Sequence, residues 1–399
     1  MSASGNRDSD RGDEPLDALV AKARTAGRVA LDTEFMGEGR YRTLLCLIQL
    51  AVPCETGERA PQVEVLLDPL AQGFDGSPLA PILADPDVQV VVHAGRQDVA
   101  LIRRLLRTEV RNVFDTQVAA GFTGLGAQCS YDSLLSELLD VRLAKSASFT
   151  RWDIRPLSTE QLAYAGEDVV HLLELARELE RRLETLGRLS WAREECAIVE
   201  ASTDERDLTT VWARLPRIRG LSAPSQAIAR ELVEWREDTA AKQDRPVQSI
   251  LGDAALVELA KRRPSSTREL EQVRGVAAGS LRRRSQELLA AVRRGGERPL
   301  EAIPGDRRPP VPEPEDAPLV ALAEALVRGR AREAGLAYEL LAARADLQAI
   351  VAAWRSGEQE ADVRTLRGWR RELAGEQLLE LLDGRLSLSA RDGALRIGA

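Results

Sequence analysis

Short apolar segments alternate with turn signals in the first part of the chain. The segments RVALDTEF (28–35), TLLCLIQLAV (43–52) and VEVLLD (63–68) each have the length and composition of a strand. A Gly-Glu-Gly turn separates the first two, and a polar stretch separates the second from the third. Hairpin-like connections of this kind predict that the three strands are antiparallel neighbours.

The hydrophobic period then changes from that of strands to that of helices. LAPILA (79–84) predicts a short helix, VQVVV (88–92) a buried strand, and 98–106 a helix with one apolar face. RNVFDT (111–116) predicts one more short strand, and the pattern beyond it is helical almost to the end. Strands first and helices afterwards predict an α/β fold, a mixed sheet with flanking helices, extended by all-α modules.

Proline and glycine mark the expected domain boundaries. A polar leader, expected to be disordered, covers 1–15, and the α/β domain covers 16–215. Two helical segments of similar length and similar internal pattern follow at 220–294 and 318–391, which indicates a divergent duplication. The proline-rich stretch 295–317 between them predicts an extended linker.

Composition excludes several classes of protein. Of the 399 residues 44% are hydrophobic and 30% charged, as in ordinary soluble proteins. No uncharged apolar run approaches the roughly 18 residues of a membrane helix, and the start lacks a secretory segment, so no membrane partner is expected. The four cysteines form no C-x-x-C pair, which favours reduced thiols and a cytoplasmic location over a zinc site or disulfides (Cys46, Cys54, Cys129, Cys196).

An acidic pair lies inside the first predicted strand. Asp32 and Glu34 are two residues apart, so both carboxylates project from the same face. Two like charges repel each other unless water or a cation surrounds them. The pair therefore indicates either an exposed edge strand or a metal site.

Two further acids and a tyrosine lie at helix starts or on helix faces. Asp98 is expected in the first turn of a helix that follows a buried strand; the helix dipole alone could explain it. Tyr164 and Asp168 are four residues apart and share a helical face, in a helix whose entry has the Ser158/Gln161 spacing of a capping box.

Together these residues indicate a specific chemistry. Carboxylates from one strand and two helices could hold two divalent cations about 4 Å apart, and hard oxygen ligands suit Mg²⁺ or Mn²⁺. Such a pair of ions hydrolyses phosphodiesters, with one activating water and the other stabilising the leaving 3′ oxygen. Tyr164 would orient the attacking water, and no Ser/His/Asp or Cys/His set supplies a protein nucleophile.

At this point the residues match a known family. LDTEF (31–35) with MGEGRYRTLLCLIQLA (36–51), VVHAGRQDVALI (91–102) and QLAYAGEDVVHLLEL (161–175) resemble the three motifs of bacterial ribonuclease D. That family belongs to the DEDDy-type 3′-5′ exonucleases, named for four acids and a tyrosine. PVQSILGDAALVELAKRRPSSTRELEQVRGV (246–276) resembles the HRDC modules of ribonuclease D and of RecQ-type helicases, and the second helical segment is assigned to them by position.

The resemblance implies a fold, an activity and a set of site residues. It implies a ribonuclease-H-like fold for 27–190 and 3′-end trimming of RNA, chiefly transfer RNA precursors, with release of nucleoside 5′-monophosphates. It makes Asp32, Glu34, Asp98 and Asp168 the metal ligands and Tyr164 the catalytic tyrosine. Possible substrate-binding residues near these motifs are Thr33, Phe35, His93, Gln97, Lys145, Trp152 and Arg155, of which Phe35 and Trp152 could equally be core residues.

The charge distribution leaves alternatives open. The net charge is −8, yet 261–294 holds ten Lys and Arg residues against three acids, which indicates a solvated face or a path for an RNA backbone. The same five residues could also serve a DNA 3′-5′ exonuclease. A third possibility is a non-catalytic RNA-binding protein whose nuclease domain is a relic. No obligate protein partner is evident from the sequence.

Overall fold

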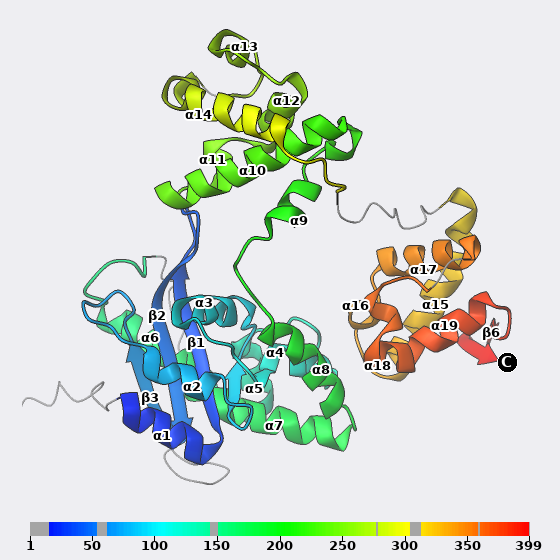
Figure 1. Ribbon diagram of the computed structural model, residues 1–399. Helices are drawn as coiled ribbons and strands as arrows, with labels where there is room; N and C mark the ends of the chain where they lie inside the picture. Colours follow the sequence, from blue (N-terminus) through cyan, green and yellow to red (C-terminus); the bar gives the residue numbers. More distant parts are fainter. Residues whose placement is uncertain are drawn as a thin grey trace, which may run out of the picture. The chain divides into compact units, whose positions relative to one another are not determined.

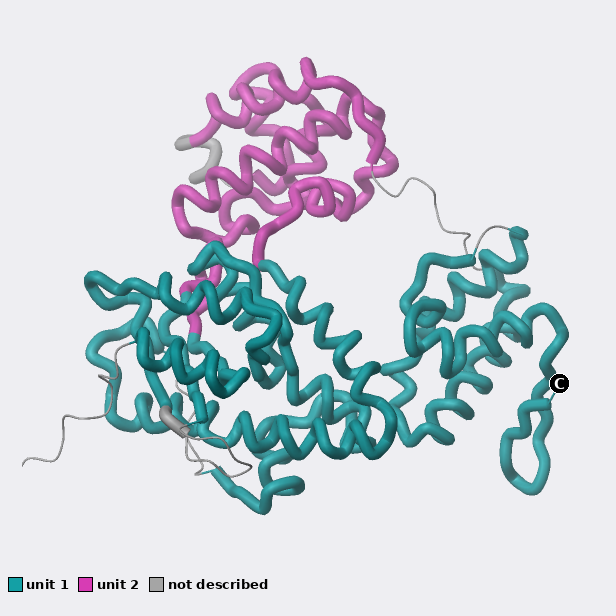
Figure 2. The backbone as a smooth tube through the Cα atoms, turned by 60° about the horizontal axis from the view of Figure 1, so that its bottom comes forward, with its two compact units in different colours: residues 1–34, 45–203, 309–399 teal, residues 35–44, 204–308 magenta. Residues whose placement is uncertain are grey.

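The computed structural model of the chain describes two compact units, coloured separately in Figure 2. Unit 1 comprises 1–34, 45–203 and 309–399, and unit 2 comprises 35–44 and 204–308. The residues that the structure describes are 16–53, 62–143, 151–276, 278–303, 313–357 and 360–398. The predicted leader, residues 304–312 of the proline-rich stretch, Cys54 and Lys145 lie outside them.

A five-stranded mixed sheet forms the centre of unit 1 (Figure 1). The strand order is β3-β2-β1-β4-β5; β2 pairs antiparallel with β3, whereas β4 pairs parallel with both β1 and β5. All five predicted strands are therefore present, and the first three are neighbours. Their bounds are Arg28–Met36 (β1), Leu44–Pro53 (β2), Gln62–Leu67 (β3), Gln89–Val92 (β4) and Val113–Asp115 (β5).

Helices cover both faces of this sheet, because the central strand is apolar on both sides. Val29 and Leu31 face one buried cluster, and Ala30 faces the other. On the first face lie α1 (Leu16–Ala26), η1 (Ser77–Leu79), α2 (Ala80–Leu83) and α3 (Arg96–Leu106). On the second lie α4 (Thr116–Gly121), α5 (Tyr131–Leu139), α7 (Leu172–Thr185) and α8 (Leu189–Glu200), while α6 (Thr159–Val170) packs against β3.

Unit 2 is a helical module with its own core. Leu232, Leu256, Leu259 and Trp212 are among the buried residues that hold its helices together. The longest helix, α10, packs against α12 and α14, and α14 continues three residues past the expected end of the module at 294. The elements are α9 (Leu208–Ala213), η2 (Ile218–Gly220), α10 (Ala223–Gln243), α11 (Val247–Ile250), α12 (Asp253–Arg262), α13 (Thr267–Glu271) and α14 (Ala278–Glu297).

The C-terminal part of unit 1 repeats the element order of unit 2. A long helix, a four-residue helix and a medium helix follow one another in both, as a duplication predicts. The elements are η3 (Pro314–Asp316), α15 (Ala317–Glu333), α16 (Tyr338–Leu341), α17 (Arg344–Ser356), η4 (Arg364–Leu366), α18 (Gly368–Arg370), η5 (Arg371–Gly375) and α19 (Glu376–Leu382).

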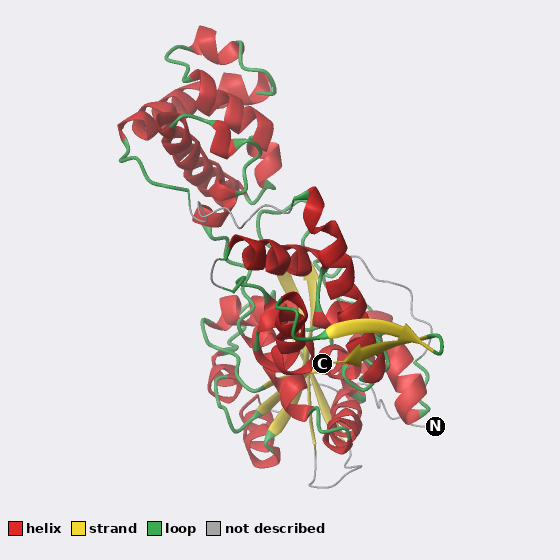
Figure 3. Ribbon diagram, turned by 90° about the vertical axis from the view of Figure 1, so that its right-hand side faces the viewer, coloured by secondary structure: helices red, strands yellow, loops and turns green. Residues whose placement is uncertain are grey.

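The second predicted helical segment, 318–391, ends earlier than expected, because its last helix stops at Leu382 and a strand covers 387–391. A two-stranded antiparallel hairpin, β6 (Ser387–Arg391) and β7 (Ala394–Gly398), closes the chain and appears as the pair of yellow strands beside the C-terminus in Figure 3. Asp392 and Gly393 both have positive φ angles, as a tight hairpin turn requires. The Asp-Gly pair is a common hairpin-turn sequence, but it follows a segment whose periodicity predicts a helix.

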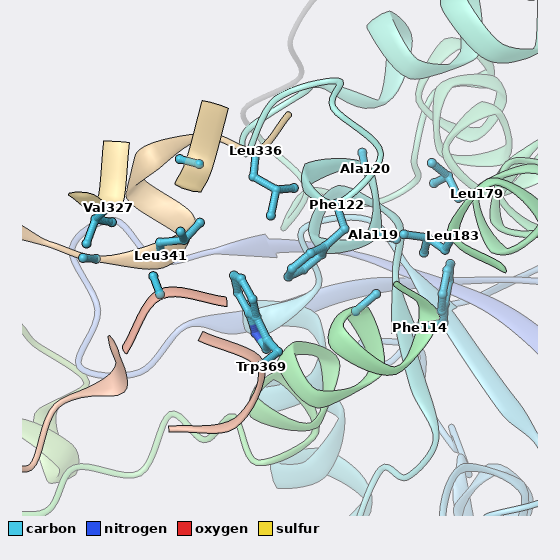
Figure 4. Close-up of a cluster of buried hydrophobic side chains, with 14 of the residues drawn as sticks. Phe114, Ala119, Ala120, Phe122, Leu179, Leu183, Val327, Leu336, Leu341 and Trp369 are labelled. Carbon is cyan, nitrogen blue, oxygen red and sulfur yellow. The ribbon is translucent and has the colours of Figure 1, made fainter. Parts of the chain in front are cut away.

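Aromatic side chains join the C-terminal module to the α/β domain within unit 1 (Figure 4). Trp369 is 1% exposed; its ring lies 5.0 Å from that of Phe122 and stacks on that of Trp191 at 5.4 Å. Beside it, Arg370 donates two hydrogen bonds to Glu195, at 2.5 and 2.8 Å. Apolar contact and a buried ion pair therefore hold the module on α8.

No helix in the described part of the chain has the length and apolar character needed to cross a bilayer. The longest helix, α10, is interrupted by charged residues throughout its length. The structure thus shows no candidate membrane-spanning helix within those residues.

Candidate active site

The central strand β1 carries the first two acidic residues. Asp32 and Glu34 alternate with buried Leu31 and Thr33, and both acids are half-buried. By the strand's alternation they lie on the same face as Ala30, as the sequence predicts. One edge of the α/β domain therefore presents two carboxylates from a single strand.

The third acid approaches β1 from the neighbouring parallel strand. Asp98 is buried in the first turn of α3, which begins four residues after β4 ends. The hydroxyl of Thr33 donates a hydrogen bond to the Asp98 carboxylate and so ties α3 to β1. Because β1 and β4 run parallel, both carry their acids toward the same edge of the sheet.

The turn before α3 is held by a carboxylate of β5. Asp115 accepts hydrogen bonds from the backbone amides of Ala94 at 3.1 Å and Gly95 at 2.9 Å. Gly95 is required there, since a Cβ atom would lie only 2.5 Å from the Val92 side chain. The same carboxylate caps α4 by accepting from the amides of Gln117 and Val118. This double use of Asp115 fixes the turn from which α3 begins, and so the position of Asp98.

Helix α6 supplies the fourth acid and the tyrosine. Its entry is the predicted capping box, in which Ser158 and Gln161 bond each other's backbone amides. Tyr164 and Asp168 lie one turn apart on this helix, and both are half-buried. The ring of Trp152 packs beside Tyr164, with 6.1 Å between the ring centroids.

Electrostatic effects show that these side chains converge. Burial, and then the charges of Asp98, Asp168 and Glu34, raise the pKa of Asp32 well above its usual value. Burial followed by Asp168 and Asp98 raises the pKa of Glu34 to about 8. Burial is also the main cause that raises the pKa of Asp98 to about 6, of Asp168 to about 7, and of Tyr164 to about 12. The acids thus repel one another, and a cation would relieve that repulsion.

The donor set fits a hard divalent cation. All four groups are carboxylates, the ligands that Mg²⁺ and Mn²⁺ prefer, and no cationic side chain is among the causes of their pKa shifts. Within the described residues, no three acidic, histidine or cysteine side chains already have the spacing of an assembled metal site.

Comparison with known proteins decides the family. A 3′-5′ exonuclease model matches 11–184, and an HRDC domain model matches 225–292. Ribonuclease D of Gluconacetobacter diazotrophicus is 36% identical over 378 residues, which cover 94% of this chain and 92% of the relative. Ribonuclease D of Acidiphilium cryptum is 35% identical over 95% of this chain and 93% of the relative. The chain belongs to the ribonuclease D family.

A solved structure of the family supports the fold. The crystal structure of Escherichia coli RNase D, described as an exoribonuclease involved in structured RNA processing, aligns with a TM-score of 0.77 at 29% identity. The alignment covers 94% of this chain and 98% of that one. The predictions of ribonuclease D family, fold class and 3′-5′ exoribonuclease activity are confirmed, and divalent metals are a property of this exonuclease superfamily.

Two of the predicted substrate-binding residues, Arg155 and Trp152, have structural roles inside the protein. Arg155 donates to both Asp68 oxygens, at 2.5 and 2.6 Å, and to the carbonyls of Cys46 and Trp152, each at 2.7 Å. Trp152 is 3% exposed and so belongs to the core. The structure therefore gives Arg155 a role in holding the segment that carries Trp152.

The remaining candidates differ in accessibility. Phe35 is 38% exposed, so the alternative that it is a core residue is wrong. Gln97 is half-buried in the first turn of α3. His93 is half-buried, and its Nδ1 pairs with the Thr116 hydroxyl at 2.9 Å. RNA binding by these residues stays a prediction.

Three residues near the site were missed by sequence reasoning: Asp68, Asp115 and Tyr131. Asp115 had a local signal, because aspartate before a helix is a common N-cap, but the predicted strand 111–116 concealed it. Asp68 lies 87 residues from its partner Arg155 in sequence, so no local pattern could connect them. Tyr131 follows the N-cap Ser130 of α5 and reads as an ordinary apolar helix residue.

Proposed function

We propose that the chain trims the 3′ ends of structured RNA, with transfer RNA precursors as substrates, by hydrolysis at two divalent cations. Asp32, Glu34, Asp98 and Asp168 would hold Mg²⁺ or Mn²⁺. The observation that carries the proposal is the placement of the acids of β1 beside Asp98, whose helix follows the parallel strand β4 and is joined to β1 by the Thr33 hydrogen bond. The mutual effect of the carboxylates on their pKa values supports it. The description of the Escherichia coli relative, which concerns structured RNA processing, supports the substrate class.

The chain's own residues determine how the reaction is positioned. When bound, the cations would activate the attacking water and stabilise the leaving 3′ oxygen. The pKa of Tyr164, raised to about 12 by burial and then by Asp168 and Glu34, keeps its hydroxyl protonated at neutral pH. That hydroxyl can therefore hydrogen-bond the attacking water and orient it toward the terminal phosphodiester. The products would be nucleoside 5′-monophosphates.

The cytoplasm remains the proposed compartment. Cys46, Cys129 and Cys196 are free thiols, as expected for a protein kept in a reducing environment. Fractionation of cells with an antibody against the chain tests this point separately from the activity.

Replacement of the acids tests the site. Asp32→Asn and Asp168→Asn each remove a charged ligand while keeping side-chain size, so the rate of 5′-monophosphate release from RNA should fall at least about 100-fold. The thermal transition of the metal-free protein should stay unchanged or rise, because a repulsive charge is lost. Asp140→Asn is the matched control: Asp140 is exposed at the C-terminal end of α5 with φ 55°, a conformation that asparagine also tolerates.

The outcomes separate the alternatives. If both site variants digest RNA at the wild-type rate, the assignment of the four acids is wrong. Faster hydrolysis of a DNA strand than of the matched RNA strand would instead indicate a DNA exonuclease. Tight RNA binding without metal-stimulated cleavage would indicate a binding protein with an inactive nuclease domain.

A further inference from the structure

A second tyrosine lies at the acidic site with its hydroxyl group buried and unpaired. Tyr131 is the first residue of α5, and its side chain is largely covered by protein. Its hydroxyl oxygen has no hydrogen-bond partner among the residues that the structure describes. A buried polar group in that state is destabilising, so it calls for a partner that the site acquires in use.

The surroundings of this hydroxyl are anionic. Burial raises the pKa of Tyr131 most, and the charge of Asp168 raises it further. The backbone amide of His171, which lies near the hydroxyl oxygen, acts in the opposite direction, and the charge of Asp32 adds the smallest of these effects. The phenol therefore stays protonated at any pH at which the enzyme works. It can serve the two carboxylates as a hydrogen-bond donor.

The ring of Tyr131 is fixed independently of its hydroxyl. It packs against the ring of His93 with 5.6 Å between centroids and a tilt of 49°. His93 is itself held by its bond to Thr116, whose hydroxyl donates to the Val92 carbonyl at 3.1 Å. The hydroxyl is thus held beside the acids by packing rather than by a bond of its own.

We propose that Tyr131 is a positioning residue whose hydroxyl donates a hydrogen bond to Asp168 once that carboxylate binds a divalent cation. The inference rests on the proposed function and extends it to a residue that would hold a metal ligand in place. Asp168 is the partner because the hydroxyl lies near the backbone amide of His171, the C-cap of α6, three residues after Asp168. Carboxylates that bind metals usually accept such an outer hydrogen bond, which fixes their orientation.

Tyr131→Phe tests the proposal, with the Mn²⁺ dissociation constant of the RNA-free protein as the readout. Paramagnetic resonance of free Mn²⁺ measures that constant without any catalytic turnover. Loss of an outer-shell partner should weaken Mn²⁺ binding about 10-fold or more. The metal-free melting temperature should stay unchanged or rise, because the variant removes only a buried unpaired oxygen.

The chain supplies a matched control in Tyr338→Phe. Tyr338 also has a buried hydroxyl without a partner among the described residues, but it lies in α16 of the C-terminal module. Tyr338→Phe should leave the Mn²⁺ dissociation constant at the wild-type value. If both variants change the Mn²⁺ dissociation constant alike, the effect is a general one of removing a tyrosine hydroxyl, and the proposal is overturned.

The result for Tyr131 can be separated from the result for the site as a whole. If the wild-type protein binds no Mn²⁺, or Asp168→Asn binds it as tightly, the proposed metal site fails. If the wild type binds Mn²⁺, Asp168→Asn weakens it and Tyr131→Phe matches the wild type, only the role of Tyr131 is wrong. In the Asp168→Asn background Tyr131→Phe should add no further loss; an undiminished 10-fold loss there would also overturn the pairing.

Discussion

Arg155 illustrates what a residue's sequence context can and cannot reveal. Its place in the segment before the third motif predicts a residue near the substrate. The structure surrounds its guanidinium with acceptors from two strand ends and from its own loop. Whether Arg155 binds substrate or holds its own loop depends on Asp68, and local sequence patterns cannot connect Asp68 to Arg155.

Arg155→Lys should destabilise the protein. Lysine cannot reproduce the forked pair of bonds to Asp68 and also reach the carbonyls, so the free energy of unfolding should fall by about 1.5–3 kcal/mol. Arg151→Lys is the control, since its pair with Asp153 is exposed and its loss should change the free energy of unfolding little. Urea denaturation of both variants measures the difference.

The same variants decide between the two roles of Arg155. Loss of the fixed Trp152 segment should lower kcat through Tyr164, with a smaller effect on KM for RNA. An Arg155→Lys protein of wild-type stability with a raised KM alone would show that Arg155 binds the substrate instead.

The five residues of the acidic site were the most predictable. Alternation along β1 places Asp32 and Glu34 on one face of the strand. A spacing of four places Tyr164 and Asp168 on one face of α6. Asp98 could not be placed by itself, because an acid in the first turn of a helix is common. Its approach to β1 depends on the parallel pairing of β1 with β4 and on the turn that Asp115 holds.

At the scale of elements, α8 connects the sheet with the C-terminal module. Toward β5, the Sγ of Cys196 accepts from the Asp115 amide at 3.3 Å, and Glu200 accepts from the Val113 amide at 2.9 Å. Toward the module, Glu195 accepts from Arg370 and from the indole of Trp369. One helix thus contacts both the strand that positions Asp98 and the docked module.

The pair of Glu195 with Arg370 predicts a pH dependence. Burial alone would raise the pKa of Glu195, but hydrogen bonds from Arg370 and Trp369 outweigh it and hold the pKa below its usual 4.5. A lowered folded-state pKa contributes stability that is present above the unfolded value and is lost as pH falls through the folded value. The stability of unit 1 should therefore decrease as the pH is lowered below about 4.5.

Glu195→Gln tests that assignment. The change leaves the buried Arg370 charge without its partner, so the free energy of unfolding at neutral pH should fall by about 3 kcal/mol. The decrease below pH 4.5 should become shallower than in the wild type. An identical acid profile in the variant would show that other carboxylates govern this pH range.

Elements with strong local signals were predicted, and those that depend on partners were not. The five strands and the capping box of α6 follow from local patterns. Strand β5 is shorter than predicted because Asp115 ends it by capping α4. The β6–β7 hairpin was missed because its Asp-Gly turn follows directly on a long helical pattern.

At the scale of the whole molecule, the basic segment 261–294 has fewer cationic side chains available for a ligand than its sequence indicates. Arg262 pairs with Glu258, and Arg294 pairs with Glu231. Arg263 donates to two serines of α10 and its N-cap, and Arg284 donates to Gln243. These four side chains serve the fold of unit 2, so the local net charge overstates what is available for an RNA backbone.

The duplicated modules have separate structural roles. The first forms the core of unit 2, whereas the second packs through Trp369 and Arg370 on the α/β domain of unit 1. The sequence predicts the duplication from helix lengths, but the apolar face that docks the second module is visible only once Phe122 and Trp191 are placed beside it. Tertiary contacts of this kind leave no periodic signal in one chain.

The most direct test of the proposed metal site is anomalous diffraction from crystals soaked in Mn²⁺. Two anomalous peaks about 3.5–4 Å apart are expected, bounded by the carboxylates of Asp32, Glu34, Asp98 and Asp168. Both peaks should be lost in Asp168→Asn crystals. Mn²⁺ bound only elsewhere, in a preparation that still releases 5′-monophosphates from RNA, would contradict the proposed metal site.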